Sequence, residues 1–129
     1  MVQMGNYASP TNTIKLYTDQ GGGQSVQDST GVLTTGAFTH YVVNLSPTIS
    51  GSNYPVTFYN NGVLATSSSA GFTVQLANGS RAFVVGDTGG GGLGGWIGMV
   101  RVYNYPLTAA QVAQNYASVK ARGSVYNLP

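Results

Sequence analysis

Acidic side chains are the first candidates for chemistry in this sequence, because hydrolytic sites are commonly built from carboxylates. The chain has only three acids, Asp19, Asp28 and Asp87, and no glutamate. A glycosidase needs two carboxylates flanking the scissile bond, one as acid and one as nucleophile or base. The three aspartates lie in separate expected loops, and no two are spaced to share one strand face. We therefore expect that this protein is not an enzyme of that kind.

His40 is the only histidine, so any acid–base relay would have to include it. A nucleophilic triad would also need a serine and an aspartate brought beside it from other strands. Local sequence does not decide whether the fold brings them together.

Aromatic side chains form a second pool of functional candidates, with nine tyrosines and one tryptophan. Sugar rings stack on aromatic faces, and tyrosine adds a neutral hydroxyl. Ordinary core packing is the alternative for every one of these residues. The glycan-contact candidates lie in or beside expected turns, face away from the apolar stripe or begin a strand at a loop edge: Tyr7, Tyr54, Tyr59, Trp96 and Tyr105.

Composition excludes several classes of function. Only 6% of the 129 residues are charged, and the net charge is +2, which does not favour nucleic-acid binding. The absence of cysteine excludes disulfides, thiolate nucleophiles and cysteine-based metal sites. No apolar run approaches the roughly 18 residues of a membrane span, and the N-terminus lacks the regions of a signal peptide.

The elements that would position these residues are expected to be strands, because nineteen glycines accompany many Ser, Thr and Asn. Alternation predicts strands over residues 13–18 and 72–76. The apolar runs 38–45 and 82–85 predict buried strands, the first of them central and covered on both faces. Turn signals recur about every 8 to 15 residues, which favours an antiparallel β-sandwich in one domain, 1–129.

A β-hairpin is expected where two short apolar runs, 56–59 and 63–66, flank Asn60-Asn61-Gly62. Asn-Gly supplies the two positive φ angles of a type I′ turn. This is the clearest local signal in the chain.

The glycine-rich stretch 86–95 is expected to be a loop at a hairpin tip and a candidate contact surface. It does not suit phosphate binding, because it leads into an expected strand over 96–103 rather than into a helix. Gly98 within that strand suggests a bulge or a close contact.

One short helix is expected at about 108–120. Thr108 and Gln111 form a capping box, in which each side chain reaches the other's backbone N–H. Gly123 is a plausible end for the helix. The core-facing stripe would consist of Val112, Tyr116 and Val119.

Three segments in this order resemble motifs of the laminin-G-like, concanavalin A-like lectin jelly rolls: 38–43, 56–65 and 95–112. The resemblance spans about residues 4–120 and implies two packed antiparallel sheets, with ligands bound at loop rims or on the concave face. It also implies that His40 belongs to a core strand and packs locally. Because many relatives bind calcium through loop carboxylates, Asp87 and Asp19 become weak Ca²⁺ candidates.

The sequence departs from this family in two ways. Phe38 stands where the family has tryptophan, which fills the same core role with less area. The family's usual first strands also fall before Met1. The chain is therefore either a shortened version whose open edge a neighbouring subunit covers, or a fragment of something longer.

Two functions remain open. We favour a non-enzymatic structural protein of a particle, such as a capsid decoration or tail component, which would form a homo-oligomer or bind other structural proteins. The alternative is a carbohydrate-binding adhesion module. Both place the protein on a virion or an extracellular surface, and neither requires a cofactor.

Overall fold

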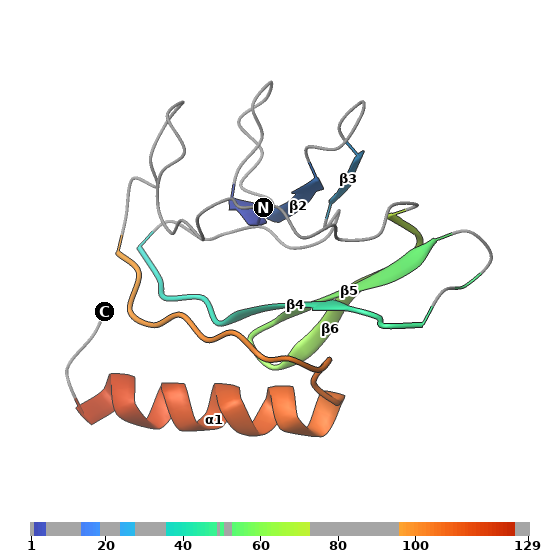
Figure 1. Cartoon of the computed structure of the whole chain (residues 1–129). Helices are drawn as coiled ribbons and strands as arrows, with labels where there is room; N and C mark the ends of the chain where they lie inside the picture. Colours follow the sequence, from blue (N-terminus) through green and yellow to red (C-terminus); the bar gives the residue numbers. More distant parts are fainter. Residues whose placement is uncertain are drawn as a thin grey trace.

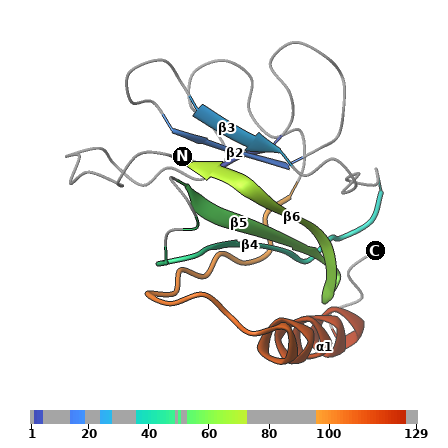
Figure 2. The same ribbon diagram turned by 90° about the vertical axis from the view of Figure 1, so that its right-hand side faces the viewer.

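Two antiparallel sheets and one helix make up the part of the chain that the structure describes, residues 2–4, 14–18, 24–27, 36–48, 50, 53–72 and 96–125. The structure is a computed structural model, shown in two views in Figures 1 and 2. The elements are β1 (Val2–Met4), β2 (Ile14–Thr18), β3 (Gln24–Gln27), β4 (Tyr41–Leu45), β5 (Tyr54–Asn60), β6 (Val63–Phe72) and α1 (Ala109–Val125).

Each sheet has three strands in sequence order, β1-β2-β3 in sheet A and β4-β5-β6 in sheet B. In both views sheet A and α1 lie on opposite sides of sheet B (Figures 1 and 2). The expected β-rich chain with one C-terminal helix is confirmed, and β2 confirms the strand expected at 13–18. The interpretation of 38–45 as a central strand was wrong in position. β4 is an edge of sheet B, and β5 holds the centre.

The hairpin between β5 and β6 is the element that the sequence predicts best. Asn61 and Gly62 have φ angles of 48° and 82°, as a type I′ turn requires. Asn60 pairs with Val63 across the turn, and one step further on Ala65 is inserted as an extra residue where the register shifts. Such a bulge bends the strand and increases its twist. β6 also runs past the predicted end to Phe72.

Side chains along each strand of sheet B point alternately to its two faces. Both faces carry apolar residues. Val56 and Phe58 are fully buried on one face, packed with Tyr41, Val43, Leu45 and Ala65. The neighbouring positions Val42 and Tyr59 point the other way and pack with Leu107 and Val112. The second cluster joins α1 to sheet B.

The start of α1 follows the predicted capping box. The Gln111 N–H donates to Thr108 Oγ1 at 3.2 Å, and the Thr108 N–H donates to Gln111 Oε1 at 2.8 Å. Val112 is fully buried, as predicted for the core-facing stripe. The predicted end was wrong, because Gly123 lies inside the helix. A helical glycine costs only about 1 kcal/mol, which is too little to end a helix that contains good helix formers just before it.

The strand expected over 96–103 was also wrong. These residues belong to neither sheet, and Trp96 is exposed rather than packed at a core rim. Aromatic and β-branched residues favour a strand, but a strand also needs a hydrogen-bonded neighbour, and β4 does not provide one here. The expected strand at 82–85, the loop at 86–95 and most of 72–76 lie outside the described residues.

Candidate interaction surface

A continuous apolar strip follows the segment from Trp96 to Tyr105, which we call the 96–105 strip. In Figure 1 it is the orange trace that runs beside β4 to the start of α1. Large side chains that an ordinary domain would bury are exposed along it. The exposed fraction is largest for Trp96 at 88% and Val102 at 75%, and substantial for Ile97, Met99, Val100 and Tyr105.

One side of the strip is anchored to α1 through Asn115. Arg101 Nη1 donates to Asn115 Oδ1 at 3.4 Å, and Asn115 Nδ2 donates to the Tyr103 hydroxyl at 3.1 Å. The Tyr103 and Tyr105 rings meet edge to face, with centroids 6.0 Å apart. Arg101 and Tyr103 therefore reach the helix, whereas Trp96 and Val102 are left to solvent.

His40 lies at the junction of the hairpin turn and α1. Its backbone N–H donates to Asn61 Oδ1 at 3.0 Å, and its carbonyl accepts from the Asn61 N–H at 2.8 Å. Its ring centroid lies 5.9 Å from that of Tyr116. Burial lowers the pKa of His40 below 6.5, and the Arg101 guanidinium lowers it further. Nδ1 is buried without a hydrogen-bond partner in the described part of the chain.

These contacts favour the structural role that the resemblance implied for His40. Neutral imidazole suits a site in which burial and the Arg101 guanidinium both disfavour the charged ring. The aspartates that a catalytic triad would need, Asp19, Asp28 and Asp87, all lie outside the described residues.

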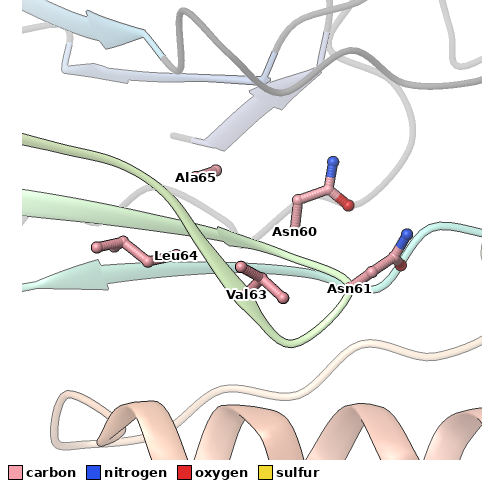
Figure 3. Close-up of a pocket in the computed structure, with 5 residues that line it drawn as sticks. All are labelled: Asn60, Asn61, Val63, Leu64 and Ala65. Atoms are coloured by element: carbon pink, nitrogen blue, oxygen red, sulfur yellow. The ribbon is translucent and has the colours of Figure 1, made fainter.

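A shallow hollow of about 440 Å³ lies over the hairpin, lined by Asn60, Asn61, Val63, Leu64 and Ala65. Figure 3 shows the side chains of Asn60 and Ala65 on the side of the hairpin away from α1. Asn60 Oδ1 has no hydrogen-bond partner among the described residues. The hollow thus combines neutral amides with aliphatic carbon and carries no charge.

The structure separates the five aromatic candidates instead of gathering them. Tyr54 is half-buried in β5, and Tyr59 is 9% exposed beneath α1, so its ring cannot serve as a platform for a ligand. Trp96 and Tyr105 are exposed and both belong to the 96–105 strip. Tyr7 lies outside the described residues.

The Ca²⁺ candidates Asp19 and Asp87 also lie outside the described residues, so the calcium expectation stays a prediction. Within the described ranges no group of three His, Cys, Asp or Glu residues could hold a metal ion. The same ranges contain no helix long and apolar enough to cross a membrane.

Sequence reasoning missed Asn44, whose side chain forms two hydrogen bonds to the backbone of Leu107. It also missed Asn115, which holds Arg101 and Tyr103. Asparagines that bond across long sequence distances have no local signature. The exposure of 96–105 was also missed, because its apolar residues were expected to pack in a strand.

The chain belongs to the concanavalin A-like lectin/glucanases superfamily, because the model of a laminin G-type family in it matches residues 3–113. The resemblance expected from the three motifs is thereby confirmed. No curated protein matches the sequence significantly.

Among solved structures, the chain is similar to the crystal structure of an S-layer domain-containing protein from Clostridium thermocellum. The TM-score is 0.51 and the identity 19%, over 87% of this chain and 59% of that one. This likeness concerns the fold, and the chain spans little more than half of that structure.

Proposed function

We propose that this chain is a non-enzymatic structural subunit that assembles on the surface of a particle, such as a phage or virus capsid or tail. The 96–105 strip carries this proposal. Monomeric proteins seldom expose contiguous apolar surface of this kind, and a strip that includes Trp96 and Val102 is typical of a surface that another protein covers.

The charge distribution also supports assembly. Arg101 is the only charged residue between Trp96 and Tyr105, and charged residues are depleted at the cores of interfaces. The whole chain has only three acids and no glutamate, which argues against the paired carboxylates of the glucanases in the superfamily.

The relative of known structure favours a surface location. It is described as an S-layer domain-containing protein. We infer from this description a structural role at a surface, which a capsid or tail component would also have. We propose further that this surface is that of a virion and not that of a cell.

The experiment is a solution mass by light scattering, combined with a thermal melt across a dilution series of the intact chain. We expect an oligomer whose melting temperature falls on dilution, because subunit binding stabilises the folded state by mass action. A folded monomer whose melting temperature does not depend on concentration contradicts the assembly proposal.

A carbohydrate-binding adhesion module is the second candidate, favoured by the uncharged hollow at Asn60 and Asn61. Amide groups hydrogen-bond sugar hydroxyls without needing charge, and Val63 and Leu64 offer aliphatic surface beside them. A glycan array with the wild type and Asn60→Ala tests it. Sugar binding that the substitution weakens at least tenfold supports this function, and no binding to any glycan argues against it.

A further inference from the structure

Within the described residues, the backbone of the 96–105 strip resembles an edge strand that has no hydrogen-bonded neighbour. It runs without coiling beside β4 in Figure 1, yet it belongs to neither sheet. None of the backbone–backbone hydrogen bonds outside the helix and strands joins it to another described residue. An extended segment whose N–H and C=O groups do not bond to the described strands is a template for pairing with another strand.

In an extended strand, successive side chains point to opposite faces. Arg101 and Tyr103 point to Asn115 on α1, whereas Trp96 and Val102 have the largest exposed fractions of the strip. A partner strand would therefore meet Arg101 and Tyr103 held by the helix, and Trp96 and Val102 open to solvent.

We propose that the partner is the same strip of a second copy of this chain, paired antiparallel about a two-fold axis at Met99. This inference rests on the assembly function proposed above and names its first contact. The axis sets Trp96 of each copy opposite Val102 of the other, so the two most exposed side chains cover each other twice. Pairs of an aromatic and a β-branched residue across two strands are favourable.

The available area suits a dimer. With about 150–250 Å² for a large aromatic side chain and somewhat less for an aliphatic one, the exposed fractions along the strip amount to roughly 700 Å² on each copy. A standard stable interface buries about 800 Å² on each partner. The strip alone thus approaches the area that such a pair needs.

The charges are compatible with the same register. Arg101 is the only charge in the strip and would face Ile97 of the other copy. The two Arg101 positions would lie about 14 Å apart, four residues along the strands, which exceeds the Debye length of about 8 Å at physiological ionic strength. A two-fold centred on Arg101 itself would instead place the like charges side by side.

The chain contains no cysteine, so single cysteines report this register without background. Met99→Cys would place a thiol directly opposite its copy, within the Cα separation that a disulfide accepts. Val63→Cys is the control. Val63 is 69% exposed, more than Met99 at 45%, but it lies on the hairpin and outside the proposed pairing. Under mild oxidation we expect Met99→Cys to form a covalent dimer at least tenfold faster than Val63→Cys.

A mixture provides a second measurement that does not depend on Met99. Trp96→Cys and Val102→Cys, carrying different tags, should form a mixed covalent dimer much faster than either forms a dimer with itself. Both side chains are largely exposed, so neither substitution removes core packing.

Equal rates for Met99→Cys and Val63→Cys, with no preference for the mixed dimer, overturn the two-fold pairing. Light scattering of the wild type, run in parallel, separates the two proposals. An oligomeric wild type without these cross-links leaves assembly in place through another face. A monomeric wild type without cross-links ends both.

Discussion

The side-chain amide of Asn44 in β4 forms hydrogen bonds with both the N–H and the carbonyl of Leu107, which lies just ahead of α1. Asn44 Nδ2 donates to the Leu107 carbonyl at 2.7 Å, and the Leu107 N–H donates to Asn44 Oδ1 at 3.1 Å. Leu107 is 6% exposed and packs with Tyr59 and Val112, so its backbone groups have little access to water. The Asn44 amide thus bonds the backbone of Leu107 as a neighbouring strand would. It thereby holds the residue that leads into α1.

Replacing Asn44 with alanine should therefore destabilise the fold. Two backbone groups of a buried residue lose their partners, and each costs about 1–3 kcal/mol when left unpaired. We expect the free energy of unfolding in urea to fall by at least about 2 kcal/mol. Asn104→Ala, at an exposed asparagine nearby, is the matched control and should change it by less than about 0.5 kcal/mol. Equal effects would mean that Asn44 does not anchor Leu107.

The capping box of α1 makes a second prediction. Thr108→Ala removes the acceptor for the Gln111 N–H and should reduce the free energy of unfolding by about 1 kcal/mol. Gln111→Ala removes the reciprocal acceptor for the Thr108 N–H. Because each residue caps the other, the double variant should lose less than the sum of the two single losses. Strict additivity in a double-mutant cycle would show that the two hydrogen bonds are independent.

Two glycines with nearly the same φ separate strain from steric contact. Gly36 has φ +80° and open space where a Cβ would lie, whereas Gly62 has φ +82° and its Cβ would lie 3.0 Å from Tyr116 Cδ1. Alanine at Gly36 should cost only backbone strain, about 1–2 kcal/mol. Alanine at Gly62 should cost about 1–3 kcal/mol more, because the turn packs on α1.

Thermal or urea unfolding of the two variants measures the difference. Adding Tyr116→Ala to the Gly62 variant should recover part of the steric cost, because the ring is removed while Cβ of residue 116, at 3.2 Å, remains. A Gly62 variant no less stable than the Gly36 variant would show that the turn does not press against Tyr116.

His40 makes folding depend on pH. Burial, and then Arg101, hold its pKa in the folded state below 6.5, so the unfolded chain takes up the proton first as the pH falls. The contribution of neutral His40 is full above pH 6.5 and is lost as the pH drops from 6.5 through the folded-state pKa. Stability should therefore rise with pH in that window.

The histidine signal in NMR belongs to this one residue, so its titration gives the pKa directly. Arg101→Gln should raise that pKa part of the way towards 6.5, since burial remains. His40→Gln should flatten the dependence of stability on pH in the same window. A measured pKa at or above 6.5 would contradict the arrangement around His40.

Local signals in the sequence predicted local structure well. Asn61-Gly62 predicted its turn because few residues adopt two successive positive φ angles, and Thr108 with Gln111 predicted the start of α1 because the two side chains satisfy backbone groups only three residues apart. The family followed from motifs that contain these same features.

Features that depend on distant contacts were not predictable in the same way. Tyr59 was expected to lie beside a turn and to contact a ligand. On β5 its side chain points to the other face from that of Phe58 and packs towards α1, about fifty residues further along the chain. Residues 96–103 were expected to form a strand, but strand pairing depends on a neighbour that local sequence does not identify. Trp96 was therefore assigned to a core rim and lies in solvent.

The most direct measurement of the central claim is the solution mass of Val102→Asp beside Val63→Asp. The two valines have similar exposed fractions, 75% and 69%, so in a monomer each substitution places a carboxylate at a similarly exposed position. We predict that Val102→Asp is a folded monomer at concentrations where the wild type and Val63→Asp remain oligomeric, because a carboxylate would be buried beside Trp96 of the other copy. An oligomer that survives Val102→Asp unchanged would contradict assembly through the 96–105 strip.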